Sequence, residues 1–158
     1  MTESNKTTVK FTLSNPIHFL ALGFGSGLSP KAPGTFGTVA AIPVFLLFTL
    51  FTPLIYAIAT LIVCIAGIYI CGKTAEDVGV HDHGAIVWDE IAGYLITMFL
   101  VPVSWQSILV GFILFRIFDI FKPWPISYLD KYVHGGFGIM IDDVVAGLMA
   151  LACMHFIF

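Results

Sequence analysis

The stretch VHDHGAIVWDEIAGYLITMFLVPV, residues 80–103, places three carboxylates and two imidazoles directly before a long apolar segment. Charge is scarce elsewhere, because 58% of the chain is hydrophobic and only 11% is charged, with a mean hydropathy of +0.97. Soluble domains carry about a quarter charged residues, so this composition is typical of a protein that lies in a membrane. The length predicts one membrane-embedded domain, residues 1–158, with a polar N-terminal segment at 1–14.

Five apolar segments predict an all-α fold, a polytopic integral membrane helical bundle. They lie at about 37–51, 54–71, 86–103, 107–121 and 143–158, and each is 15 to 18 residues long. A helix perpendicular to the membrane needs about 20 residues to cross it, so we expect five short spanning helices that thin the bilayer or use flanking turns. Before them, SNP at 14–16 predicts an interfacial or re-entrant helix, followed by a loop rich in glycine and proline at 25–38.

The positions of the lysines predict the orientation of these segments. The connections at 52–53 and 102–106 hold no charged residue. The other connections hold Lys31, Lys73, Lys122 and Lys131, and the N-terminal segment holds Lys6 and Lys10. Alternating spans put all six on one side of the membrane, and positively charged loops face the cytoplasm. We therefore expect the N-terminus inside and the C-terminus outside.

The same alternation gathers the acidic residues into one layer at the cytoplasmic surface. Asp89 and Glu90 lie near the start of the third segment, Asp119 closes the fourth, and Asp142 with Asp143 opens the fifth. Carboxylates near hydrocarbon are costly unless they are paired or coordinated, which makes each of them a candidate for function. Ordinary acidic residues at helix N-termini are the alternative. Oxygen ligands without a matched set of cysteines and histidines favour Mg²⁺ over zinc.

Basic residues follow the fourth segment in the sequence FRIFDIFKPWP, residues 115–125. Arg116, Asp119 and Lys122 are spaced at i, i+3 and i+6, which places them near one face of a helix end. Arg116 is the only arginine of the chain, and a guanidinium in an apolar span needs a carboxylate or phosphate partner. Arg116 and Asp119 could simply neutralise each other, but Lys122 would still be free to bind a phosphate.

Two loops add further candidates. In GFGSGLSPKAPGTFGT, residues 23–38, glycines and hydroxyl side chains can turn backbone N–H groups toward an anion, and Lys31 adds positive charge. Taken alone, this stretch is better interpreted as a flexible loop at the membrane surface. In VHDHG, His81 and His83 can bind a metal or transfer a proton, although they can also lie in a solvated loop.

Taken together, these motifs resemble the phosphatidylglycerophosphatase A family over nearly the whole chain. The similarity lies in SNPIHFLALGFGSGLSPKAPGTFGT, VHDHGAIVWDEIAG, FRIFDIFKPWPI and HGGFGIMIDDVVAG, which occur in the family's order. The resemblance implies a Mg²⁺-dependent enzyme of the bacterial inner membrane that hydrolyses phosphatidylglycerol phosphate to phosphatidylglycerol. It implies an acidic site at Asp89, Glu90, Asp119, Asp142 and Asp143, and a phosphate-facing loop at Lys31, Gly34 and Thr35.

A mechanism follows as a hypothesis. The acids hold one or two Mg²⁺ ions that activate a water, while Lys31, Arg116 or Lys122 binds the terminal phosphate. A second acid, His81 or His83 transfers protons. Since the net charge is −3, nucleic acid is excluded as a partner. The expected partners are the membrane and the lipid substrate. The sequence leaves the oligomeric state open, although glycines in the apolar segments could support close packing with a second copy of the chain.

Two other functions are compatible with acids at a membrane surface. A CDP-alcohol phosphatidyltransferase would carry the pattern D-G-x2-A-R…G-x3-D-x3-D, which the spacing of Asp119, Asp142 and Asp143 does not match. A small transporter or channel with an acidic vestibule would place ionisable groups near the middle of the membrane. Here the acids stop at one face, so we expect the enzyme.

Overall fold

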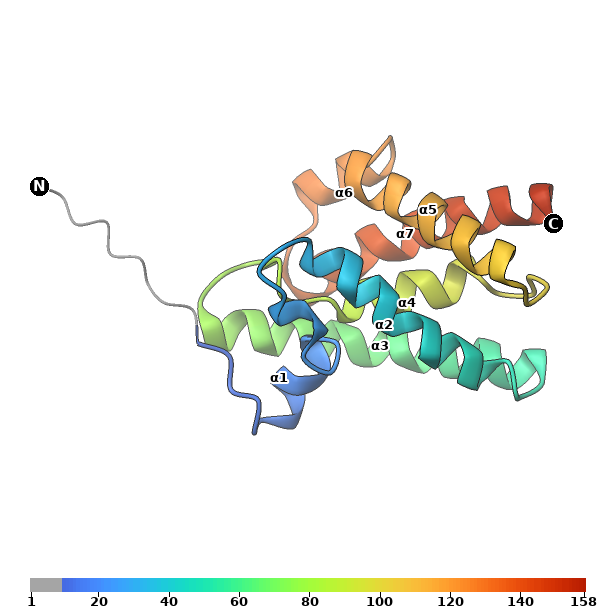
Figure 1. The fold of residues 1–158 in the computed structure, drawn as a ribbon. Coiled ribbons are helices and arrows are strands. Elements are labelled where there is room, and N and C mark those ends of the chain that lie inside the picture. The colour runs from blue at the N-terminus through green and yellow to red at the C-terminus, as the bar shows by residue number, and fades with distance from the viewer. Residues whose placement is uncertain (1–9) are drawn as a thin grey trace, which may run out of the picture.

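The computed structural model describes residues 10–158, and this part of the chain is entirely helical, without β-strands. Lys6 and most of the predicted polar segment at 1–14 lie outside the described residues. Seven α-helices and one short 3-10 helix follow one another (Figure 1): α1 (Pro16–Ala21), η1 (Ser26–Leu28), α2 (Pro33–Phe48), α3 (Pro53–Val78), α4 (Trp88–Thr97), α5 (Trp105–Phe121), α6 (Ile126–Tyr132) and α7 (Gly135–Ile157). The all-α prediction is confirmed.

Local sequence explains where several helices begin. The side chain of Asn15 accepts a hydrogen bond from the N–H of Ile17 at 3.0 Å, and Pro16 occupies the first turn of α1, as SNP predicts. At α5, Ser104 and Ser107 form a reciprocal capping box in which each side chain accepts from the other's backbone N–H at 3.0 Å. Helix starts are thus set by short polar motifs between apolar runs.

The short helix α4 lies at the centre of the bundle. It packs against α7, α2, α3 and α5, and Figure 1 shows it enclosed by the longer helices. Its Tyr94 and Leu95 are fully buried. The hydroxyl of Tyr94 donates to the carbonyl of Ile108 on α5 at 3.1 Å, and the hydroxyl of Tyr56 on α3 donates to the carbonyl of Leu95 at 2.6 Å. These bonds satisfy the two buried phenols and fix α4 to its neighbours.

Within residues 10–158, two helices are long and apolar enough to cross a membrane. They are α3, with 26 residues, and α7, with 23. Large apolar side chains on α3 point outward: Leu54, Ile58, Leu61, Ile62 and Ile65 are each about half exposed or more. A continuous apolar outer surface of this kind is typical of contact with lipid. The predicted number of about five spans stays a prediction.

The helix boundaries differ from the predicted segments at several places. α2 begins at Pro33, inside the loop predicted at 25–38, and α3 continues to Val78 instead of ending near 71. Within 86–103 only Trp88–Thr97 is helical, and ten residues rise only about 15 Å, so α4 cannot cross a bilayer alone. The following turn contains Leu100, whose φ of 59° ends helical geometry. The last helix starts at Gly135 rather than near 143, and the unpredicted α6 precedes it. Hydropathy does not distinguish an apolar turn from an apolar helix. It also does not show whether a run of glycines is helical or forms a loop.

Glycines bring the helices close together within the chain. A Cβ atom on Gly67 would meet the side chains of Met140 and Trp88, and one on Gly147 would lie 2.6 Å from the carbonyl oxygen of Gly93. These positions therefore serve contacts of α3 with α7 and of α4 with α7. Their role in packing is intramolecular here.

Candidate functional site

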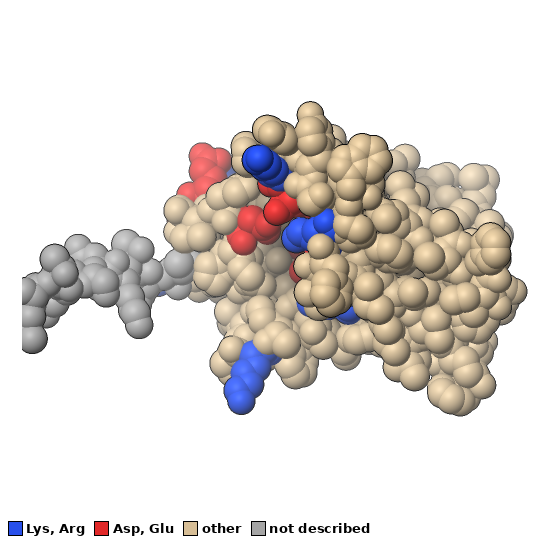
Figure 2. Space-filling view, turned by 90° about the horizontal axis from the view of Figure 1, so that it is seen from above, with Lys and Arg blue, Asp and Glu red and all other residues tan. Residues whose placement is uncertain are grey.

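A cavity of about 190 Å³ lies where one end of α4, α5 and α7 meets the loop before α4. Its lining is mostly ionisable and consists of Asp82, His83, Gly84, Ile86, Asp89, Glu90, Asp119, Lys122, Ile139, Asp142 and Asp143. Figure 2 shows acidic and basic side chains gathered toward one end of the molecule, while the rest of the visible face is without charge. The structure thus brings together the acids that the sequence distributes over three segments.

Three carboxylates form the centre of this cavity. Asp89 and Glu90 lie in the first turn of α4, and Asp143 lies about two turns into α7. One oxygen from each lies within 4.8 Å of the others, an arrangement that could hold a metal ion. Asp89 and Asp143 are only 6% and 2% exposed. Three carboxylates this close and this buried repel one another strongly unless a cation lies between them.

Unpaired oxygen atoms indicate where a cation would bind. Oδ1 of Asp89, Oε2 of Glu90, Oδ1 of Asp142 and Oδ2 of Asp143 are buried and have no hydrogen-bond partner within the described residues. Buried polar atoms are normally satisfied, and leaving a charged one unpaired is costly. Hard oxygen donors of this kind suit Mg²⁺, so the residues present fit the ion that the sequence predicts.

Two basic residues lie beside these acids. Nη1 of Arg116 pairs with Oδ2 of Asp119 and lies 4.0 Å from Oε1 of Glu90. Nζ of Lys122 lies 3.9 Å from Oδ1 of Asp119. Partial burial lowers the pKa of Lys122, but the negative charges of Asp119 and Asp143 outweigh it and hold the pKa above its ordinary value. Lys122 is therefore charged next to the cavity.

The glycine-rich loop reaches the site through one residue only. Gly34, at the start of α2, is so close to the site that a Cβ atom there would lie 2.9 Å from Nη1 of Arg116 and 3.1 Å from Oε1 of Glu90. Thr35 does not line the cavity, and Lys31 is exposed and makes no ion pair among the described residues. Lys31 and Thr35 therefore do not lie with the acids. The loop touches the site where α2 begins, and its tip faces outward.

The two histidines of VHDHG separate in space. His83 lines the cavity, and its Nδ1 accepts a hydrogen bond from the N–H of Ala85 at 3.0 Å. His81 instead lies next to His134, with 5.7 Å between ring centroids, beside a different surface hollow. The structure therefore does not bring His81 to the acidic cavity, since the two histidines of this turn point in different directions.

Asp82 lines the cavity but was not among the sequence candidates. Its backbone has a φ of 51°, the left-handed conformation that aspartate tolerates better than most residues. The sequence contained no signal for Asp82 beyond its position between His81 and His83. The chemical interpretation of that stretch concerned the two histidines.

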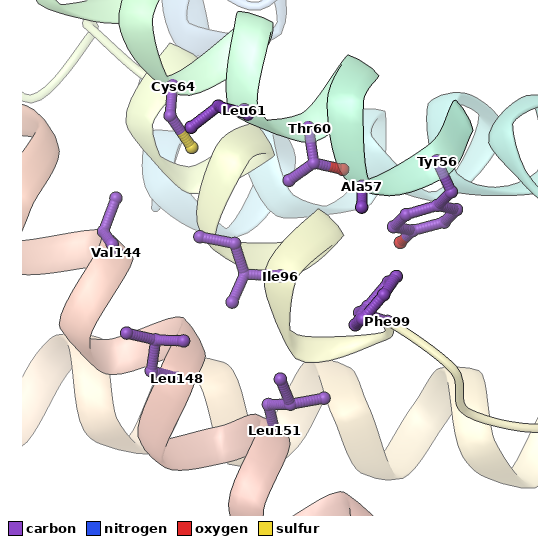
Figure 3. Close-up of a pocket in the computed structure, with 10 residues that line it drawn as sticks. All are labelled: Tyr56, Ala57, Thr60, Leu61, Cys64, Ile96, Phe99, Val144, Leu148 and Leu151. Carbon is purple, nitrogen blue, oxygen red and sulfur yellow. The ribbon is translucent and has the colours of Figure 1, made fainter. Parts of the chain in front are cut away.

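A second cavity of about 290 Å³ lies between α3, α4 and α7 (Figure 3). Apolar side chains dominate its lining, and they point toward one another across the gap in the close-up. The hydroxyl of Tyr56, its largest polar group, is already bonded to the carbonyl of Leu95. Its lining contains no carboxylate or histidine, so the acidic cavity is the candidate active site.

Comparison with known proteins gives a consistent result. The family model described as phosphatidylglycerophosphatase A matches residues 19–158. The chain is 50% identical over 149 residues to phosphatidylglycerophosphatase A of Escherichia coli (strain K12), covering 94% of this chain and 87% of that protein. It is 52% identical over 153 residues to phosphatidylglycerophosphatase A of Haemophilus influenzae, covering 96% and 93%. No solved structure matches the chain.

Proposed function

The chain belongs to the phosphatidylglycerophosphatase A family, and on that premise we propose that it hydrolyses phosphatidylglycerol phosphate to phosphatidylglycerol and inorganic phosphate. The observation that carries this proposal is the buried group of Asp89, Glu90 and Asp143 with basic side chains beside it. Carboxylates that can hold a divalent cation next to cations that can hold a phosphate suit phosphoryl transfer to water.

Asp89, Glu90 and Asp143 hold a Mg²⁺ ion in this proposal, with Asp142 completing the set through its own unpaired oxygen. The chemistry that such an ion supplies is neutralisation of the phosphoryl oxygens and acidification of an attacking water. The protein contributes a buried and fixed set of oxygens. Fixed groups need no reorganisation as charge develops on the phosphate.

Arg116 and Lys122 bind the oxygens of the terminal phosphate. Their charge-assisted hydrogen bonds are stronger than neutral ones, and the planar guanidinium can bind two oxygens at once. Gly34 leaves room for this guanidinium, since any side chain would press on it.

His83 donates a hydrogen bond from Nε2 to the leaving oxygen. Because its Nδ1 accepts from the backbone N–H of Ala85, the proton of the neutral ring is on Nε2. The proton that the departing alcohol gains comes from the attacking water and is transferred by one of the cavity acids. His81, Lys31 and Thr35 have no part in this proposal.

The enzyme is a multi-pass protein of the bacterial inner membrane, with the acidic cavity facing the cytoplasm. The gathering of charge at one end (Figure 2) and the length of α3 and α7 support this orientation. In this arrangement the cavity lies at headgroup depth, where the phosphate of a lipid is found. A reporter enzyme that is active only in the periplasm should work when fused after Phe158, and activity only in cytoplasmic fusions would contradict the orientation.

Phosphate release by the purified protein tests the proposed function. The protein is treated with EDTA, given phosphatidylglycerol phosphate in detergent micelles, and assayed for inorganic phosphate with and without Mg²⁺. We expect release that depends on Mg²⁺, is lost in Asp89→Asn, and is retained in Glu76→Gln, which removes an exposed acid of α3 outside the cavity. Phosphatidic acid serves as a second substrate to measure selectivity. No release from phosphatidylglycerol phosphate with any divalent cation would refute the proposal.

A further inference from the structure

The acids of the cavity fall into two groups according to what their oxygens contact. Asp89, Glu90 and Asp143 each have a buried oxygen without a partner. Both oxygens of Asp119 instead face basic groups: Oδ2 pairs with Arg116, and Oδ1 lies 3.9 Å from Nζ of Lys122. One oxygen from each of the first three residues lies within 4.8 Å of the others, and Asp119 is not part of that group.

Both cations lie next to Asp119 at the C-terminal end of α5. Arg116 lies one turn before it, and Lys122 follows it as the C-terminal cap of the helix. Lys122 has a φ of 48°, a left-handed conformation that is costly for a residue with a Cβ atom and persists only where the surroundings enforce it. Arg116 also extends from Asp119 toward Glu90, with 4.0 Å between Nη1 and Oε1. Arg116 therefore lies between Asp119 and Glu90, and Lys122 lies beside Asp119.

We propose that Asp119 is a positioning residue for phosphate binding and not a metal ligand. It holds Arg116 and Lys122 at the edge of the group formed by Asp89, Glu90 and Asp143, so that both cations bind the phosphoryl oxygens beside the metal. This assignment rests on the proposed function, and it differs from the expectation that all five acids share the metal.

The energetics of the alternative favour this division. To bind a metal through Oδ2, Asp119 would give up its ion pair with Arg116, whose Nε already has no partner, and through Oδ1 it would place the metal next to the ammonium group of Lys122. A buried guanidinium without its carboxylate is strongly unfavourable. The other three carboxylates lose no bond when a cation enters, because their free oxygens have no partner to lose.

Two binding measurements on the full-length protein in detergent test the assignment without requiring turnover. Mn²⁺ replaces Mg²⁺ and is followed by electron paramagnetic resonance, and inorganic phosphate is titrated into Mn²⁺-loaded protein by calorimetry. For Asp119→Asn we expect Mn²⁺ affinity within about threefold of wild type and phosphate affinity at least about tenfold weaker, as for the loss of a charge-assisted hydrogen bond. For Asp143→Asn we expect Mn²⁺ affinity at least about tenfold weaker. Asp119→Glu, which keeps the charge, should recover part of the phosphate affinity.

Arg116→Gln and Lys122→Gln extend the test if Asp119→Asn does not fold. If Asp119 acts through these cations, both variants weaken phosphate binding and leave Mn²⁺ binding within about threefold. Where Asp119→Asn does fold, the double variant Asp119→Asn/Arg116→Gln binds phosphate no more weakly than the weaker-binding of its two parents. A loss of Mn²⁺ affinity in Asp119→Asn equal to that in Asp143→Asn would overturn the assignment, as would unchanged phosphate affinity in Arg116→Gln and Lys122→Gln. Failure of the proposed function would show separately, as an absence of phosphate release by wild type.

Discussion

Replacing Gly34 by alanine tests how closely the start of α2 fits the site. The added Cβ would lie 2.9 Å from Nη1 of Arg116 and 3.1 Å from Oε1 of Glu90. Carbon and nitrogen atoms in good contact lie about 3.5 Å apart or more, so the guanidinium must move by about 0.6 Å. The atoms concerned are the ends of flexible side chains, which can yield without moving the backbone.

The expected cost is therefore catalytic and not structural. Since a misplacement of about 1 Å can cost about a hundredfold in rate, a shift of about 0.6 Å predicts a loss near tenfold in kcat/KM. That loss corresponds to about 1.4 kcal/mol of transition-state stabilisation. Alanine is the better helix former by up to about 1 kcal/mol, which offsets the strain. The melting temperature should change by less than about 4 °C.

The assay is release of inorganic phosphate from phosphatidylglycerol phosphate, combined with thermal unfolding of the same preparation. The control is the same change made in Arg116→Gln, where the crowded group has been shortened. There Gly34→Ala should cost less than about twofold further, because the two changes act on one contact. Activity of Gly34→Ala within twofold of wild type would refute the reasoning, and so would an equal loss in both backgrounds.

Three further predictions concern the metal, the helix packing and the N-terminal segment. Mg²⁺ at a hundred times its dissociation constant should stabilise wild type by about 2.7 kcal/mol and raise its melting temperature. Asp89→Asn should show no such rise. An equal rise in both proteins would contradict the assignment of Asp89 to the metal. Gly136→Ala should destabilise the protein by about 1 to 3 kcal/mol, because its Cβ would press on the backbone of α3, and unchanged thermal unfolding would show that α3 and α7 are less tightly packed. His18 on α1 is buried, and its ring contacts Asp77 on α3 at 3.0 Å. His18→Ala should therefore speed proteolysis within residues 10–15. An unchanged cleavage rate would show that the contact between His18 and Asp77 does not hold this segment in place.

The sequence predicts the helical class and the gathering of acids for a clear physical reason. Apolar runs of 15 to 18 residues need internally bonded backbone in a membrane. Their alternation fixes which ends lie on the same side, so Asp89, Asp119 and Asp143 are placed together before any contact is known. Membership of the phosphatidylglycerophosphatase A family also follows from motifs visible in the sequence.

Helix ends and side-chain directions are less accessible from the sequence. The early start of α7 depends on the close approach of Gly136 to the backbone of α3. This contact makes the glycine run helical, whereas composition alone predicts a loop there. His81 and His83 differ in direction because of the turn between them, and its left-handed Asp82 gives no pattern in the sequence. These are tertiary effects, and local periodicity does not contain them.

The sequence also does not predict which acids face cations and which have unpaired oxygens. Spacing at i, i+3 and i+6 shows that Asp119 can reach both Arg116 and Lys122. It does not show that both oxygens of Asp119 face cations while one oxygen each of Asp89 and Asp143 has no hydrogen-bond partner. That distinction depends on where α4 and α7 place their carboxylates relative to the end of α5.

The most direct test of the account is made on Asp143→Asn, with Mg²⁺-dependent phosphate release and Mn²⁺ binding measured on one folded preparation. The substitution keeps the shape of the side chain and removes only its charge from the group with Asp89 and Glu90. We predict that hydrolysis of phosphatidylglycerol phosphate and cation binding fall together, while thermal unfolding without metal stays close to that of wild type or shifts upward, because a buried repulsion is relieved. Wild-type hydrolysis and wild-type Mn²⁺ affinity in this variant would contradict the account.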